Sequence, residues 1–145
     1  MTCTFFGHRD CYDVDTENLR YTIENLISLG VETFYVGNQG YFDRIVFECL
    51  LKLKEIYPQL RIFVVLAYLP IAKSTYDPYS GYSIYPEGIE IGPPRFAVER
   101  RNKWMLEQSD YCLCCVNYSR GGAHKFALQA KRKGLTVINL GSEKI

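Results

Sequence analysis

The sequence predicts a single α/β domain, residues 1–145, built on a parallel sheet with helices on both faces. Short, nearly uncharged strand-like runs alternate with amphipathic helical patterns along the chain. The 145 residues, 48% of them hydrophobic, are enough to enclose one core. Strands that alternate with helices favour right-handed crossovers and therefore a parallel sheet.

The expected strands are runs rich in β-branched and aromatic residues. They occupy residues 2–6, 33–36, 61–67, 111–116 and 135–140. Because charged residues hardly interrupt these runs, they suit strands that are buried on both faces. In a doubly wound arrangement the chain builds outward and then returns beside the first strand, which predicts a mainly parallel five-stranded sheet of order 3-2-1-4-5.

Apolar residues at helical spacing predict a helix after each of the first two strands and on either side of the fourth. The first helix is expected to follow a cap at Asp15 or Thr16, and the second to end before Pro58. The third and fourth are expected to cover about residues 95–108 and 122–133. The basic run at residues 131–133 lies at the end of the last helix, where cations complement the helix dipole.

The connection over residues 68–94 has neither a helical nor a strand periodicity and is long for a loop in a small domain. It contains Pro70, Pro78, Pro86, Pro93 and Pro94, with Tyr76, Tyr79, Tyr82 and Tyr85. Two interpretations stay open. The segment is a lid or binding loop whose tyrosines stack on a base or fill a subunit interface, or it is a loop packed over the edge of the sheet.

Charge and composition limit the partners. A formal net charge of +1 gives no overall attraction to duplex DNA or to an anionic membrane, and no apolar run is long enough for a membrane span. We expect a cytoplasmic protein, monomeric or a simple homo-oligomer. The six cysteines (Cys3, Cys11, Cys49, Cys112, Cys114 and Cys115) lack zinc-ligand spacing, so we expect small buried thiols, with no metal and no cofactor.

The predicted topology places ligand-binding loops after the first and fourth strands, where the strand order reverses. In the first loop Gly7 lets a ligand approach the backbone, His8 can bond a ribose or phosphate, and Arg9 offers several donors. A simple turn with a solvated arginine is the alternative interpretation of this short motif.

The loop after the second strand contributes Gly37, Asn38 and Gly40, which can present backbone donors at a helix N-terminus. Asp43 follows in the first helical turn, where it either complements the helix dipole or contacts a ribose hydroxyl. On the third helix Arg101 and Asn102 lie on or beside the inward face. A buried guanidinium needs a carboxylate, carbonyl oxygens or a ligand phosphate.

The segment between the fourth strand and the last helix is the strongest local signal. It contributes Ser119, Gly121, Gly122, Ala123 and His124. Its glycines permit close approach while the helix N-terminus offers free N–H groups to a phosphate, although a tight turn alone would also explain them. The segment fits neither the P-loop nor the dinucleotide-binding fingerprint.

Together these segments resemble the SLOG (SMF/DprA-LOG) superfamily, in particular the small bacterial and phage DUF1273/YpsA-like domains. The matching segments are residues 4–9, 37–43, 95–105, 109–110 and 121–134, which extend over nearly the whole chain. The resemblance implies a Rossmann-like domain that binds a nucleotide or nucleotide-derived ligand, such as a relative of ADP-ribose. Sensing or sequestering that ligand is the implied role.

One branch of the superfamily, the LOG proteins, cleaves the base from nucleoside monophosphates with an arginine and a Pro-Gly-Gly-x-Gly-Thr-x-x-Glu motif. Arg101 matches the arginine, and residues 121–122 match the paired glycines. His124 and Lys125 replace Gly-Thr, and Leu128 stands where the catalytic glutamate is required. Phosphoribohydrolase activity is therefore the alternative function, and no catalytic residue is assigned.

Overall fold

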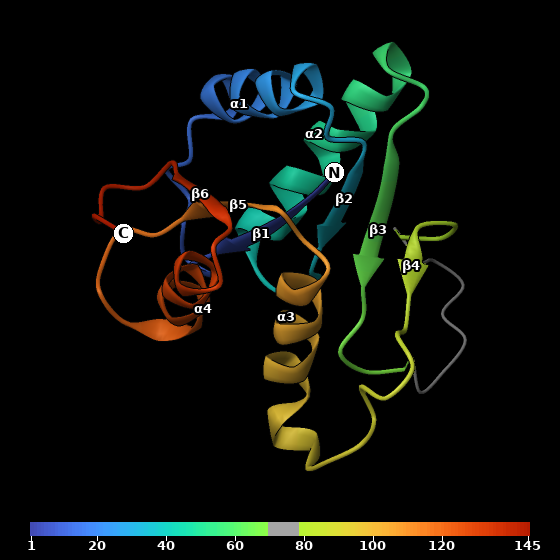
Figure 1. The fold of residues 1–145 in the computed structure, drawn as a ribbon, viewed down its shortest axis with the longest axis vertical. Helices are drawn as coiled ribbons and strands as arrows, with labels where there is room; N and C mark the ends of the chain where they lie inside the picture. The colour runs from blue at the N-terminus through green and yellow to red at the C-terminus, as the bar shows by residue number, and fades with distance from the viewer. Residues whose placement is uncertain (70–78) are drawn as a thin grey trace.

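Six parallel strands form one sheet in the order β4-β3-β2-β1-β5-β6 (Figure 1). They are β1 (Thr2–Gly7), β2 (Thr33–Val36), β3 (Arg61–Val65), β4 (Ser83–Ile84), β5 (Tyr111–Cys115) and β6 (Thr136–Asn139). The structure is a computed structural model and describes residues 1–69 and 79–145. The α/β class and the relative order of the five predicted strands are confirmed. The strand number is corrected, because β4 adds a sixth strand at the edge.

Four helices cover the sheet: α1 (Thr16–Ser28), α2 (Tyr41–Ile56), α3 (Ala97–Glu107) and α4 (Gly121–Arg132). The Asp15 carboxylate caps α1 by accepting the N–H groups of Glu17 and Asn18. A 3₁₀ turn, η1 (Pro94–Phe96), leads into α3. Within the described residues, no helix has both the length and the apolar character that a membrane span requires.

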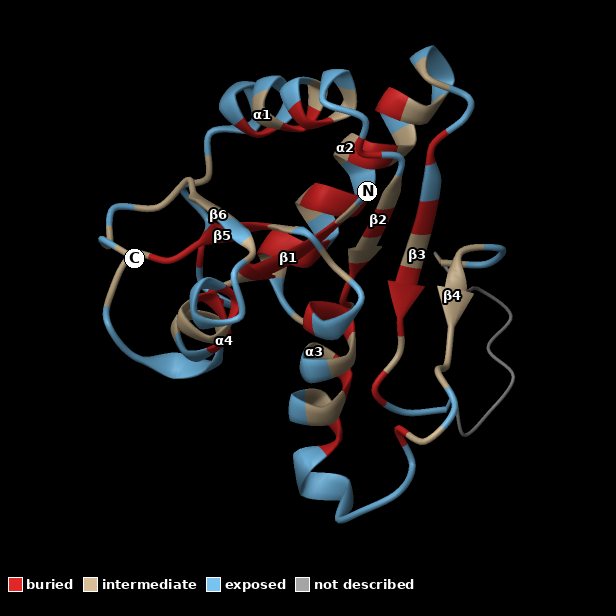
Figure 2. Cartoon of the chain, viewed as in Figure 1, coloured by how far each residue is buried: buried red, intermediate tan, exposed pale blue. Residues whose placement is uncertain are grey.

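Two hydrophobic clusters lie on opposite faces of the sheet. One joins the inward side chains of α1 and α2 to the sheet, and the other joins those of α3 and α4. Neighbouring side chains of β1 show the alternation: Phe5 belongs to the first cluster, whereas Phe6 stacks on Phe126 of α4 with ring centroids 5.5 Å apart. Buried residues accordingly lie along the strands and on the inward helix faces (Figure 2).

Strand β4 lies inside the connection for which no strand was predicted. Ser83 and Ile84 pair with Val64 and Val65 of β3, so β4 covers only the end of its neighbour. On that side of β3, no strand in the described part of the chain pairs with the beginning of the strand, where the Arg61 guanidinium lies 5.5 Å from the Phe63 ring centroid. Two residues are too few to produce a strand periodicity, which is why the pattern missed β4.

Described tyrosines of the same connection pack against helix α2. The rings of Tyr79 and Tyr82 meet Phe47 edge-on, with centroid distances of 5.1 and 5.5 Å. This part of the connection is therefore packed over the sheet edge, as one of the two interpretations has it. Tyr76, Pro70 and Pro78 lie outside the described residues.

The cysteines differ from the expectation in one respect. Cys3, Cys112 and Cys114 are buried thiols and Cys49 is a half-buried one, but Cys11 and Cys115 are joined by a disulfide. The expectation of six thiols is thus wrong for this pair, whose members are 104 positions apart in the sequence. The disulfide connects the loop after β1 to the end of β5.

Gly7 ends β1 where the strand passes closest to α2. A Cβ atom at this position would lie 2.3 Å from carbon atoms of the Phe42 ring. We expect Gly7→Ala to lower the free energy of unfolding by about 1–3 kcal/mol through overpacking, measured by urea denaturation. Gly122→Ala is the control, because a Cβ there meets no atom within 4 Å. Equal stability of the two variants would contradict the prediction.

Candidate functional site

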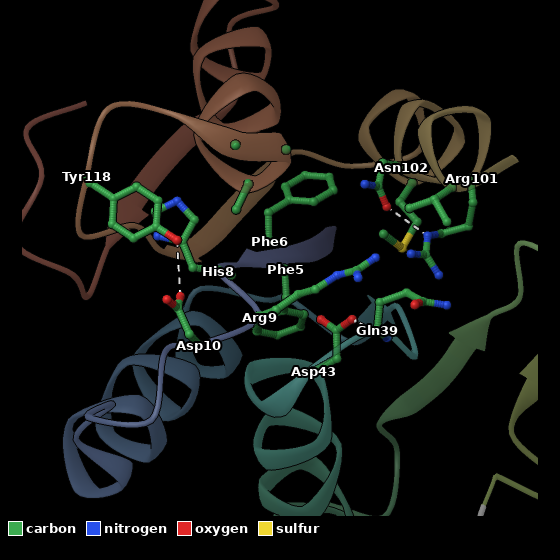
Figure 3. A pocket seen from close by; sticks show the side chains of 16 residues that line it. Phe5, Phe6, His8, Arg9, Asp10, Gln39, Asp43, Arg101, Asn102 and Tyr118 are labelled. Atoms are coloured by element: carbon green, nitrogen blue, oxygen red, sulfur yellow. Dashed lines mark hydrogen bonds between the residues drawn. The ribbon is translucent and has the colours of Figure 1, made fainter. Parts of the chain in front are cut away.

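A cavity of about 560 Å³ opens at the carboxyl ends of β1 and β5, where the strand order reverses. It is built from β1 and its following loop, the loop after β2, the first turn of α2, one face of α3, and the segment that enters α4 (Figure 3). Its lining residues are Phe5, Phe6, Gly7, His8, Arg9, Asp10, Gln39, Asp43, Val98, Arg101, Asn102, Met105, Tyr118, Gly121, Gly122 and Ala123.

The buried imidazole of His8 joins the two loops that were predicted to meet. Its Nδ1 accepts the backbone N–H of Asn117 at 3.3 Å, and its Nε2 lies 3.0 Å from the carbonyl oxygen of Arg120. This pattern assigns the hydrogen to Nε2, which donates to the carbonyl. Both ring nitrogens therefore bond to the protein, so His8 shapes the wall of the cavity instead of offering a free nitrogen to a ligand.

Tyr118 extends this junction between the loops. Its ring stacks on His8 with a centroid distance of 3.7 Å, and its hydroxyl donates to Asp10 Oδ1 at 3.1 Å. The Arg120 guanidinium lies 5.2 Å from the centroid of the Tyr118 ring. The loops after β1 and β5 are thus held together by ring stacking, by hydrogen bonds of His8 and Tyr118, and by the Cys11–Cys115 disulfide.

The first residues of α4 face the cavity with exposed backbone. Gly121 has φ of +88°, and a Cβ at Gly122 would meet no atom within 4 Å. No side chain caps this helix at Arg120. The N–H groups of the first turn have no partner within their own helix, so they can serve a ligand anion.

Arg101 is a buried cation at the cavity wall, with 2% of its surface exposed. Its Nη1 donates to the carbonyl oxygen of Val65 at 2.9 Å and to Asn38 Oδ1 at 3.3 Å, while its Nε donates to Asn102 Oδ1 at 2.7 Å. Burial lowers the pKa of the guanidinium, and the charge of Asp43 opposes that effect. Oxygen atoms of neutral groups thus hold most of the Arg101 donors.

Asp43 brings the opposite charge into the same wall and is 8% exposed. Its Oδ2 accepts the backbone N–H of Gln39 at 2.9 Å. Burial raises the pKa of the Asp43 carboxyl to about 6, although the Gln39 N–H and the charge of Arg101 act in the other direction. A Cβ at Gly37 would lie 2.9 Å from Asp43 Oδ2 and 3.0 Å from Arg101 Cζ, so only glycine leaves room for both groups.

One polar atom on each of these buried charges stays open. Arg101 Nη2 and Asp43 Oδ1 have no hydrogen-bond partner among the residues that the structure describes. No described side chain has a fully enclosed nitrogen or oxygen without a partner, so neither atom is fully enclosed, and both residues line the cavity. The two ion pairs of the described chain lie elsewhere, at Arg20–Glu24 and Lys125–Glu99.

Arg9 adds an exposed cation above the same space. Figure 3 shows its side chain extending over the cavity toward Asp43, Gln39 and Arg101. A Cβ at Gly40 would lie 3.0 Å from the Arg9 Cα, so the missing side chain of this glycine, which also has a positive φ, lets the two loops pass closely. In the described chain the Arg9 guanidinium makes no ion pair.

Most of the residues predicted from sequence come together around this cavity. Gly7, His8, Arg9, Asp43, Arg101, Asn102, Gly121, Gly122 and Ala123 line it. Gly37, Asn38 and Gly40 lie directly behind the wall, in contact with lining residues. Exposed Ser119 and half-buried His124 do not line the cavity.

Several lining residues were not among the individual site residues predicted from sequence. These are Phe5, Phe6, Asp10, Gln39, Val98, Met105 and Tyr118. Val98 and Met105 stand three positions before and four after Arg101, so helical spacing places them on the same inward face. Asp10 and Tyr118 lie in the two loops predicted to bind a ligand, but no sequence pattern reveals the contact between them, which joins positions far apart in the chain.

A scan against protein-family models and a search of curated proteins match nothing to this chain. The class of the protein is given by its fold and site: a parallel α/β domain with a cavity, lined by both charged and apolar side chains, at the reversal of strand order. In the described part of the chain, no group of three or more metal-ligating side chains could hold a metal ion.

The raised pKa of Asp43 predicts a pH-dependent stability. The pKa of Asp43 is about 6 in the folded state and 3.8 ordinarily, so the folded state holds the proton more strongly. The free energy of unfolding therefore falls as the pH rises from 3.8 to about 6, and the loss is roughly 3 kcal/mol above pH 6. We expect Asp43→Asn to unfold like the natural protein near pH 4 and to be more stable by up to that amount at about pH 8, measured by urea denaturation.

A matched control replaces a carboxylate outside the cavity. Glu99 is exposed and pairs with Lys125, so Glu99→Gln should change stability by less than about 1 kcal/mol at both pH values. If Asp43→Asn is no more stable than the natural protein at the higher pH, the effect of burial on Asp43 has been assigned the wrong sign.

Proposed function

We propose that the cavity binds a nucleotide or nucleotide-derived ligand, an ADP-ribose relative or a nucleoside phosphate, and that the domain senses or sequesters it. The observation that carries the proposal is the pair of buried opposite charges at the cavity wall, Arg101 and Asp43, each with one polar atom that has no partner among the described residues. Burying charges is costly, and a ligand that bears both an anion and hydroxyl donors would satisfy both groups.

The anionic part of such a ligand fits the side of the cavity formed by α4. Residues 121–123 offer N–H groups at the positive end of the helix dipole, and Arg9 and Arg101 supply cations. Backbone donors and guanidinium groups are the usual partners of phosphate oxygens.

The remaining wall suits a sugar and a base. The Asp43 carboxylate can accept hydrogen bonds from ribose hydroxyls, and the amide groups of Gln39 and Asn102 can both donate and accept. Val98 and Met105 add apolar surface for a ring. The volume of about 560 Å³ lies within the range of small-molecule sites.

The resemblance to the SLOG superfamily supports the same class of ligand, and we propose membership in that superfamily on its sequence segments. The proposal places the protein in the cytoplasm with a small molecule as partner. A net charge of +1 does not favour nucleic acid as that partner.

Titration calorimetry of the purified protein with AMP, ADP and ADP-ribose tests the binding function. We expect at least one of these ligands to bind, and Arg9→Ala and Gly122→Ala each to weaken it about tenfold or more. The first variant removes a charged donor, and the second places a methyl group in the cavity. Arg20→Ala, which removes an exposed arginine of α1, is the control and should leave the affinity unchanged.

Two results would overturn the binding proposal. One is that none of the three ligands binds the natural protein. The other is that binding occurs but neither Arg9→Ala nor Gly122→Ala weakens it, which would put the ligand elsewhere.

The position of Asp43 favours a second candidate function, hydrolysis of a nucleoside monophosphate. Asp43 is a carboxyl group inside the cavity, whereas Leu128, at the place of the LOG glutamate, is a half-buried residue of α4 and does not line it. Chromatography of nucleoside monophosphates after incubation with the protein decides between the functions. Release of free base over many turnovers, abolished by Asp43→Asn, would establish hydrolysis in place of simple binding.

A further inference from the structure

Two tyrosines at the edge of the cavity have no role in either hydrophobic cluster. Tyr12 and Tyr41 meet edge-to-face, with ring centroids 5.2 Å apart and an interplanar angle of 60°. The Arg44 guanidinium lies 5.2 Å from the centroid of the Tyr41 ring. Tyr12 is 70% exposed. Core packing therefore does not account for this group of side chains, which we call the aromatic platform.

Backbone contacts attach the aromatic platform to the cavity wall. The N–H of Tyr12 donates to the carbonyl oxygen of Asp10 at 2.8 Å, and the N–H of Tyr41 donates to that of Arg9 at 3.5 Å. Asp10 and Arg9 both line the cavity. The platform thus borders the cavity on the side where the loop after β1 meets the start of α2.

The chemistry of the platform is that of a stacking surface for a flat ring. A tyrosine ring can stack on any of the nucleobases, because every base has a flat face. A guanidinium over one ring adds a cation that can stack or contact a phosphate. Arg9 lines the cavity, its carbonyl oxygen accepts the N–H of Tyr41, and its guanidinium makes no ion pair in the described chain. A cation in this position suits phosphates that bridge two nucleosides.

We propose that the aromatic platform is a second subsite, and that the ligand is a dinucleotide whose one nucleoside fills the cavity while its other base stacks on Tyr12. The inference rests on the proposed nucleotide-binding function and narrows its ligand class. The two nucleosides are joined through phosphates held by Arg9 and the start of α4. A mononucleotide would occupy the cavity alone and leave the platform empty.

The test compares two probes that differ only in the second base. Diadenosine diphosphate has two adenosines, and ADP-ribose has the same skeleton with a hydroxyl group in place of one adenine. We expect the natural protein to bind diadenosine diphosphate about tenfold more tightly in titration calorimetry. Tyr12→Ala should remove this preference and leave the affinity for ADP-ribose unchanged, whereas Tyr12→Trp should keep the preference.

Both substituted tyrosines are exposed, so a change in affinity should not arise from unfolding of the variants. Tyr12 is 70% exposed, and Tyr21→Ala, at a 65% exposed tyrosine of α1, is the matched control that should keep the preference. If ADP-ribose binds but diadenosine diphosphate binds no better, or if Tyr12→Ala weakens both probes equally, the second subsite is refuted and the binding function stands. If neither probe nor a mononucleotide binds, the proposed function itself fails.

Discussion

The site depends on the contact between the turn after β1 and the turn after β5, which the His8 imidazole makes with both of its nitrogens. Parallel strands deliver their following loops to one edge of the sheet, but they do not by themselves fix the distance between those loops. Two links fix it: the Cys11–Cys115 disulfide, and the bonds of His8 to the backbone of Asn117 and Arg120, with Tyr118 stacked on the His8 ring. The amides at the start of α4 are consequently held at one wall of the cavity.

The opposite wall is held by charges that a stable fold has little reason to bury. Arg101 is surrounded by neutral oxygen acceptors and Asp43 accepts one backbone N–H, so each charge is only partly compensated within the protein. The glycine at position 37 brings the two groups close without a direct ion pair in the described chain. These two buried charges lower the stability of the fold and form an organised polar surface, which is the usual arrangement at a binding site.

Much of the fold could be predicted because its signals are local. Uncharged apolar runs marked five strands, and the Asp15 cap marked the start of α1. Other features depend on contacts between distant residues. Gly7 was interpreted as a place for a ligand, yet it is also small because the Phe42 ring occupies the space of a side chain. Likewise no spacing rule pairs Cys11 with Cys115, and no motif reveals that the nitrogens of His8 bond to protein.

The incomplete cover of β3 by β4 has a consequence for how these molecules behave when crowded. A partly bare strand edge can act as a template on which another chain adds a strand, the first step of many aggregates. Here the portion that no described strand pairs with begins at Arg61, and Lys54 lines the same hollow. Two molecules approaching through this edge would bring like charges together, so the edge discourages sheet extension from one copy to the next.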